Sequence, residues 1–134
     1  MIRGSCLCMG VRYEISTNLE EMHHCHCSRC RKSHGAAFST FARTREAGLR
    51  LLSGQQKVRD YQSSEAVRRS FCQDCSSSLF FRFAPLPDAV WVAVGTFDDD
   101  PGMRPEAHIF VASKAPWHEI TDPLPRFDEY PPQD

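Results

Sequence analysis

Seven cysteines supply most of the chemistry available to this chain of 134 residues. They fall into an N-terminal pair (Cys6 and Cys8), a central trio (Cys25, Cys27 and Cys30) and a hairpin pair (Cys72 and Cys75). Gaps of one or two residues allow neighbouring thiolates to converge on one ion, and a structural zinc takes four such ligands in a tetrahedron. An odd number of cysteines also excludes a framework in which all are joined by disulfides within one chain. The spacing therefore predicts bound zinc.

The count divides into one closed site and one open site. Four cysteines complete a structural zinc site, whereas three leave a fourth position free for water or substrate. The hairpin pair could join the N-terminal pair, which leaves the central trio as the open site, or it could join Cys27 and Cys30. We favour the first partition, because three thiolates within six residues can hold an ion locally. A single zinc with three spare thiols is the main alternative, and a redox role for the hairpin pair is disfavoured because no βαβ pattern surrounds it.

The elements that must position these thiols are short strands separated by turn residues. Val11, Tyr13 and Ile15 alternate with charged residues, which is typical of a half-buried strand. Further strands are predicted at 37–42, 49–52, 58–61, 67–71, 79–83, 90–94 and 108–111, and one short helix at 28–34. We expect a mainly β, single-domain, zinc-stabilised fold of antiparallel sheets with little helix. Residues 1–122 form the predicted domain, and the proline-rich acidic tail at 123–134 should lie on its surface, anchored by Leu124, Phe127 and Tyr130.

Composition narrows the class of protein further. A net charge of −1 gives no basic excess for binding phosphates, so we expect no nucleic-acid partner. No apolar run approaches the roughly 20 residues of a membrane span, and the first residues lack the apolar stretch of a signal peptide. We therefore expect no membrane partner and a cytoplasmic location, where thiols stay reduced.

The sequence around the cysteines resembles the glutathione-dependent formaldehyde-activating enzyme family, also called the CENP-V/GFA domain. The resemblance is carried by GSCLC at 4–8, CHCSRCRK at 25–32, FCQDC at 71–75, HIFV at 108–111 and KAPW at 114–117. It implies a β-tent fold with two zinc ions, a structural one held by the N-terminal and hairpin pairs and a catalytic one held by the trio. It also implies a carbon–sulfur lyase that joins glutathione to formaldehyde as S-(hydroxymethyl)glutathione, or splits that adduct.

Two positions depart from the family pattern. Met9 and Ser76 stand where the family usually has glycine, at turns that suit a positive φ. Methionine and serine adopt that conformation less readily than glycine. We therefore expect distorted turns at the structural zinc site, and no such departure at the trio.

The charged residues beside the trio suggest how a substrate would bind. A glutathione sulfur, or that of another small thiol, could occupy the open zinc position as a thiolate and attack formaldehyde. Arg29, Arg31 and Lys32 could then hold the glutathione carboxylates, although a solvated basic face explains them equally well.

The proton donor would come from the histidines. His26 and His34 are nearest to the trio in sequence, and four others are further candidates: His23, His24, His108 and His118. We expect His23 and His24 to be exposed, and His108 to be a hydrogen-bonded strand residue.

A non-catalytic, zinc-stabilised module that binds a protein partner is the competing function. Such a module needs only closed metal sites, whereas a lyase needs the open position. Its interaction patch would have to come from Trp91, Trp117 or the 80–83 segment, and we expect all three to be core. The sequence leaves the oligomeric state open.

Overall fold

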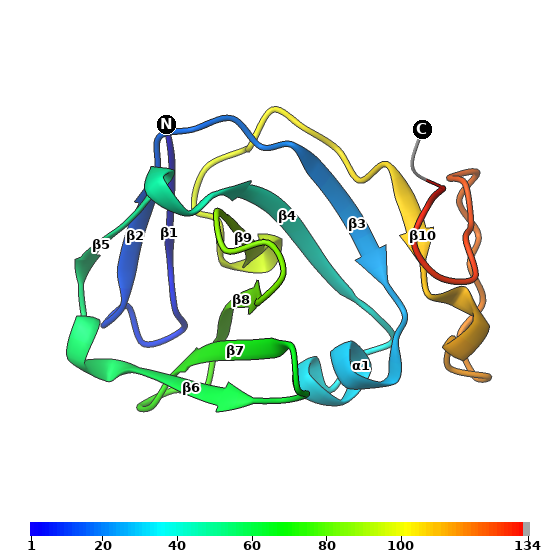
Figure 1. Cartoon of the computed structure of the whole chain (residues 1–134), viewed down its shortest axis with the longest axis horizontal. Helices are drawn as coiled ribbons and strands as arrows, with labels where there is room; N and C mark the ends of the chain where they lie inside the picture. The colour runs from blue at the N-terminus through cyan, green and yellow to red at the C-terminus, as the bar shows by residue number, and fades with distance from the viewer. Residues whose placement is uncertain (133–134) are drawn as a thin grey trace.

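Two β-sheets and one short α-helix make up the computed structural model, which describes residues 1–132 (Figure 1). The smaller sheet has the strand order β1 (Ile2–Ser5), β2 (Arg12–Ile15) and β5 (Leu49–Ser53). The larger sheet has the order β10 (Ala107–Ile109), β3 (Glu21–Cys25), β4 (Ser39–Arg45), β9 (Ala89–Ala93), β8 (Ser78–Phe83), β7 (Val67–Cys72) and β6 (Val58–Gln62). Neighbouring strands are antiparallel except for β10 and β3, which run parallel. The prediction of a mainly β, single-domain fold is confirmed.

Most predicted elements lie where the residue pattern placed them. The helix α1 (Ser28–His34) spans the predicted range, and each predicted strand overlaps an observed one. Strands β1 and β3 were not predicted, because a glycine interrupts the first and the histidine-rich β3 lacks β-branched residues. Strand β10 ends at Ile109, earlier than expected, because Phe110 takes a left-handed φ of 57°. Among the described residues, no helix has the length and hydropathy that a membrane span requires.

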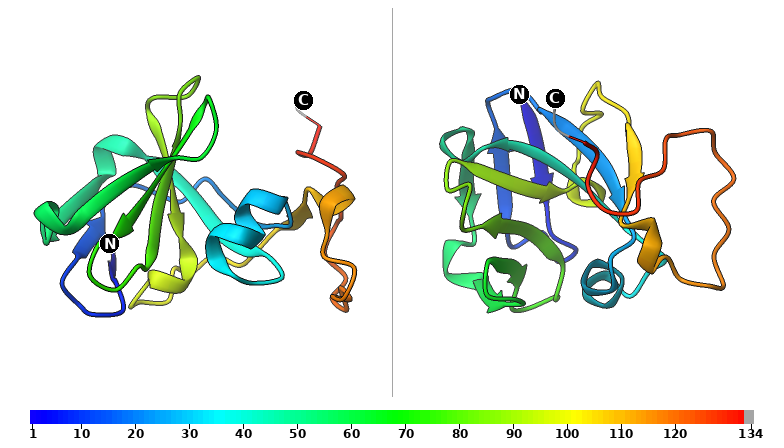
Figure 2. Two further views of the ribbon diagram at one scale, coloured as in Figure 1. Left: turned by 90° about the horizontal axis from the view of Figure 1, so that it is seen from below. Right: turned by 45° about the vertical axis from the view of Figure 1, so that its right-hand side comes forward.

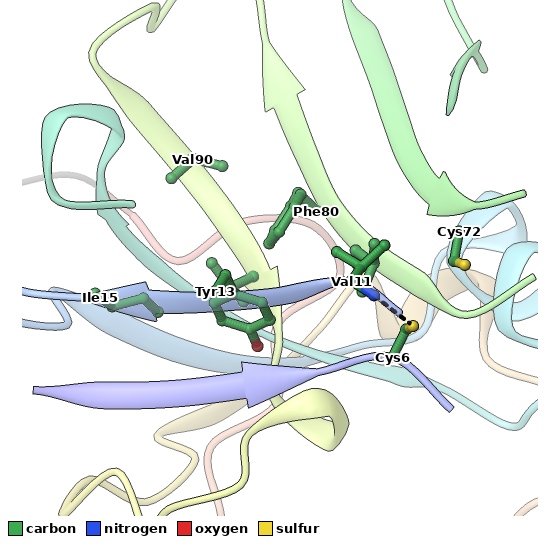
Figure 3. Close-up of a cluster of buried hydrophobic side chains, with 9 residues drawn as sticks. Cys6, Val11, Tyr13, Ile15, Cys72, Phe80 and Val90 are labelled. Atoms are coloured by element: carbon green, nitrogen blue, oxygen red, sulfur yellow. Dashed lines mark hydrogen bonds between the residues drawn. The ribbon is translucent and has the colours of Figure 1, made fainter. Parts of the chain in front are cut away.

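The main core lies between the two sheets and extends to the cysteines. Tyr13 and Ile15 from β2 pack with Phe80 and Val90 from the larger sheet, and Cys6 and Cys72 belong to the same buried cluster (Figure 3). The Tyr13 hydroxyl shares a hydrogen bond of 2.6 Å with the Thr96 hydroxyl. At one end of this cluster, the Val11 N–H donates to the Cys6 sulfur at 3.3 Å. Any metal held there would therefore be continuous with the apolar core.

A second buried cluster surrounds the trio on the other face of the larger sheet, because its Trp91 and Phe81 alternate along β9 and β8 with Val90 and Phe80 of the main core. Cys25 and Cys30 pack with Phe41, Trp91 and Ile109. The two clusters of cysteines are thus supported by separate parts of the core.

The C-terminal segment lies along β10, at the opposite end of the molecule from β1 and β2 (Figure 2). The Phe127 N–H donates to the His108 carbonyl, and the His108 N–H donates to the Pro125 carbonyl, each at 2.9 Å. Leu124 and Phe127 are half-buried, whereas Tyr130 is 55% exposed. Residues 133–134 of the predicted tail lie outside the described residues, and the division at 122/123 stays a prediction.

Candidate metal centres

The N-terminal and hairpin pairs come together as a cluster of four thiols. All four Sγ atoms lie within 4.8 Å of one another, with 3.5 Å between those of Cys6 and Cys8 and 3.8 Å between those of Cys8 and Cys72. A tetrahedron of sulfurs around zinc, with bonds of about 2.3 Å, has edges of about 3.8 Å. The cluster therefore fits a zinc ion, and it joins the β1–β2 loop to the β7–β8 hairpin.

The turns at this cluster keep the glycine conformation without glycine. Met9 has a φ of 66° and Ser76 a φ of 64°, both in the left-handed region. The Met9 N–H donates to the Cys6 carbonyl at 3.0 Å, and the Ser76 N–H donates to the Cys72 carbonyl at 2.8 Å. The expected distortion is therefore absent from these turns. Instead, the backbone of Met9 and of Ser76 adopts a left-handed conformation that costs free energy in residues other than glycine.

The trio is assembled by the end of β3 and the start of α1. Cys25 is the last residue of β3, Cys27 caps the helix, and Cys30 lies in its first turn. The Cys27 sulfur accepts a hydrogen bond from the Cys30 N–H at 3.2 Å, and Gly35 ends the helix with a left-handed φ of 61°. The three sulfurs lie within 4.8 Å of one another.

The trio lacks a fourth protein ligand in the part of the chain that the structure describes. No His, Cys, Asp or Glu joins it at ligand distance. Its three thiols suit zinc as well as the cluster of four does, but they would leave one coordination position free. Of the two partitions that the spacing left open, the structure thus has the hairpin pair beside the N-terminal pair.

Arg69 is a neighbour of the trio that sequence reasoning missed. Its Nη2 lies 3.7 Å from the Cys30 sulfur, and its guanidinium lies over the Phe81 ring at 5.6 Å. Hydrogen bonds from Cys25 and Cys27 and the nearby Arg69 charge lower the pKa of Cys30, while hydrogen bonding and burial raise the pKa of Cys25. Arg69 is 39 residues from Cys30 in the sequence, and the pairing of β7 with β8 places it opposite Phe81, beside the trio.

Two cavities adjoin the trio and share Arg29, Phe41 and Arg69 in their walls. The smaller cavity, about 250 Å³, is lined by all three cysteines of the trio. Its apolar wall consists of seven further side chains beside Phe41: Val67, Phe81, Phe83, Trp91, Ile109, Phe110 and Tyr130. The larger cavity, about 460 Å³, is lined by the cationic Arg29, Lys32 and Arg69 and by several serines, together with the rings of Tyr61, Phe71 and Phe80.

The three predicted carboxylate-binding residues are thus placed differently. Arg29 lies on both cavities and Lys32 on the larger one. Arg31 lines neither cavity, and its Nε is buried without a hydrogen-bond partner among the described residues.

A hydrogen-bonded chain of two buried histidines and a partly exposed aspartate fixes the loop that carries the trio. His26 is completely buried, and its Nε2 lies 2.8 Å from Nδ1 of His108, whose Nε2 lies 2.8 Å from an Asp122 carboxylate oxygen. Because a carboxylate only accepts, the His108 Nε2 donates to Asp122, and in the tautomer with its proton on Nε2 the His108 Nδ1 accepts from His26. Burial and the neighbouring His108 and His118 lower the pKa of His26 to about 4. His26 lines neither cavity beside the trio, so these hydrogen bonds orient the loop and do not face a substrate. Asp122 was not predicted to take part in them.

The structure also tests the burial and hydrogen bonding predicted for three histidines and one tryptophan. His108 is hydrogen-bonded as expected, but His23 and His24 are half-buried, against the prediction of exposure. The His24 ring packs on Phe38 at 4.6 Å, and its Nδ1 bonds the Thr40 hydroxyl at 2.7 Å, because β3 is covered on that side. Trp117 is 72% exposed, so the prediction that it belongs to the core is wrong; it lies in a turn after β10, beyond the sheets.

The comparison with known families rests on the same residues. The profile described as glutathione-dependent formaldehyde-activating enzyme matches residues 1–113, which contain both cysteine clusters. This chain belongs to that family. A Phaeosphaeria nodorum protein named after the family is 31% identical over 113 residues, which cover 81% of this chain and 60% of the relative. An uncharacterized lyase of Schizosaccharomyces pombe is 22% identical over 124 residues, which cover 92% of this chain and 88% of that protein.

The fold of this chain also has a solved counterpart. A Rhodobacter sphaeroides crystal structure superposes with a TM-score of 0.63 and 24% identity, covering 77% of this chain and 91% of that one. An Aspergillus flavus protein named after the family is 32% identical over 113 residues, but this chain covers 59% of it. This chain thus spans about 60% of the length of the P. nodorum and A. flavus relatives.

Proposed function

We propose that this protein is a zinc-dependent carbon–sulfur lyase that joins the thiol of glutathione, or of another small thiol, to formaldehyde, or splits the adduct. The observation that carries the proposal is the trio of thiols in a cavity wall, without a fourth ligand in the described part of the chain. The family name and the S. pombe lyase support the same reaction class.

Two zinc ions are part of this proposal. Cys6, Cys8, Cys72 and Cys75 would hold a structural ion, and Cys25, Cys27 and Cys30 a catalytic one. Bound to these three thiolates, a zinc ion would keep one position open and would lower the pKa of a thiol that binds there.

The residues of the chain bind and orient the substrates. Arg29 and Lys32 can pair with the carboxylates of glutathione in the larger cavity, and Arg69, between the cavities, offsets negative charge beside Cys30. His23 and Tyr130 line the smaller cavity and are the candidate proton donors for the adduct oxygen. The His26–His108–Asp122 chain holds the loop between Cys25 and Cys27 in place.

Exchange spectroscopy tests the proposal. Zinc-loaded protein is mixed with glutathione and ¹³C-formaldehyde, and the exchange between free and adduct carbon is followed by NMR. We expect acceleration over buffer that Cys27→Ser removes and Leu52→Ser retains, since Leu52 is an exposed residue of the smaller sheet. No acceleration by the zinc-loaded wild type would overturn the assignment of substrates. A cytoplasmic location stays a prediction.

A further inference from the structure

The smaller cavity beside the trio has walls that formaldehyde does not need. We propose that the carbonyl compound handled at this site carries an apolar ring, so that the adduct is the hemithioacetal of a thiol and an aromatic aldehyde. The inference rests on the proposed function and names a different carbonyl substrate for it.

The size of the cavity is the first argument. Its volume is about 250 Å³. An apolar cavity of about 150 Å³ in a protein interior holds benzene, and one water occupies about 30 Å³ of the liquid. Formaldehyde has only two heavy atoms, so it would leave most of the space unfilled. A ring with a short substituent fills it.

The construction of the wall is the second argument. Phe81 is stacked on Trp91 with centroids 4.9 Å apart and ring planes 6° apart, and Phe41 meets Phe81 edge-on at 4.7 Å. Phe110 and Tyr130 form another edge-on pair at 5.0 Å. Aromatic faces and edges arranged in this way are the surfaces on which a further ring packs with favourable geometry. A site for a small polar aldehyde gains nothing from them.

The distribution of charge gives the orientation. Arg29 and Arg69 lie on the boundary with the larger cavity, which also carries Lys32, and the charged parts of a thiol such as glutathione would lie there. The polar side chains elsewhere in the smaller cavity are Glu21, His23 and Ser64, and Glu21 is already paired with Arg43 at 3.6 Å. The reacting sulfur would thus lie at the trio, with its charged part on one side and the ring on the other.

The reaction balances without an oxidant or reductant. The substrate thiolate gives an electron pair to the carbonyl carbon, which forms the C–S bond, and the π pair of the C=O bond moves to oxygen. The proton lost by the thiol is matched by the one gained at that oxygen. The reverse reaction breaks the same C–S bond and returns the aldehyde and the thiol.

The first experiment compares two aldehydes. The acceleration over buffer of adduct exchange is measured by NMR for zinc-loaded protein with glutathione and either formaldehyde or 4-nitrobenzaldehyde. We expect the acceleration for the aromatic aldehyde to be at least tenfold greater. Acceleration with formaldehyde alone would overturn this inference and keep the proposed function, whereas acceleration with neither would overturn both.

Filling the cavity tests the ring site, with a matched substitution elsewhere as the control. Val67→Phe narrows the smaller cavity, and Leu52→Phe adds a ring to an exposed strand far from it. The first variant should lower the ratio of aromatic to formaldehyde acceleration at least tenfold, and the second should leave that ratio unchanged. An unchanged ratio in Val67→Phe would count against the ring site.

Binding without turnover gives an independent readout. The chain has two tryptophans, and Trp117→Phe leaves Trp91 in the cavity wall as the only one. Benzyl alcohol, which has a ring but no carbonyl, should change Trp91 emission with a saturable dependence on concentration, and Val67→Phe should weaken that binding. A change that is linear in concentration, or no change, would contradict the inference.

Discussion

Restoring glycine at the two left-handed turns of the four-cysteine cluster should stabilise this protein. Met9 and Ser76 have φ values of 66° and 64°, and each turn is closed by a backbone hydrogen bond to a cysteine carbonyl. Both side chains are exposed, so their replacement leaves no cavity in the core. We therefore expect Met9→Gly and Ser76→Gly each to raise the free energy of unfolding.

The magnitude follows from two opposing effects. A left-handed backbone costs a residue other than glycine about 1–2 kcal/mol. Glycine also increases the entropy of the unfolded chain, which lowers the free energy of unfolding by about 0.4–1 kcal/mol. The net gain is about 0.5–1 kcal/mol at each site. Met9 also loses a weak contact at 3.3 Å from the Ser5 hydroxyl, but that hydroxyl donates to Asp98 as well, so Ser76→Gly should show the larger gain.

Urea unfolding at a fixed free zinc concentration measures the effect, because bound metal adds to the apparent stability. Ser33→Gly provides the control: Ser33 is exposed in the helix α1, where glycine should cost about 0.3–0.5 kcal/mol relative to serine. A gain at Ser76 with a loss at Ser33 supports the reasoning. If Ser76→Gly loses stability while its zinc content and denaturant slope stay unchanged, the account of these turns is refuted.

Other predictions concern the buried polar groups. His108→Ala should lower the free energy of unfolding by about 2–3 kcal/mol, because it leaves His26 buried without its partner. Urea unfolding measures this loss. As a control, Trp117→Ala, at an exposed site, should change the free energy of unfolding by less than about 0.5 kcal/mol. Burial raises the pKa of Tyr13 above its usual range, so this residue ionises first in the unfolded chain as the pH passes about 10. Stability should therefore fall above that pH, and Tyr13→Phe should weaken the fall; an identical pH profile for Tyr13→Phe would contradict this reasoning.

The three groups of cysteines and the helix could be predicted because their signals are local, although spacing left open which groups share an ion. The spacing of ligands along a few residues is independent of the rest of the fold, and α1 spans the range its sequence indicated. Strand β3 was missed because Glu-Met-His-His-Cys has no β-branched residue, and its strand conformation comes from pairing with β4 and β10. Local propensity does not contain that pairing.

The surroundings of the trio could not be predicted because they come from distant segments. Arg69 reaches Cys30 from β7, and Asp122 reaches His108 from beyond β10. The aromatic cavity combines side chains of β4, β8, β9 and the C-terminal segment, none of which forms a motif by itself. Which face each of these strands turns to the trio depends on sheet register, which a single sequence does not fix.

The central claim is that the seven cysteines hold two zinc ions as a closed cluster of four and an open trio. Native mass spectrometry of the zinc-loaded protein, with and without glutathione, tests it most directly. We expect two zinc ions in the wild type, one in Cys27→Ser, and one additional glutathione that binds the wild type but not this variant. One zinc ion in the wild type, or two ions and bound glutathione in Cys27→Ser, would contradict the account.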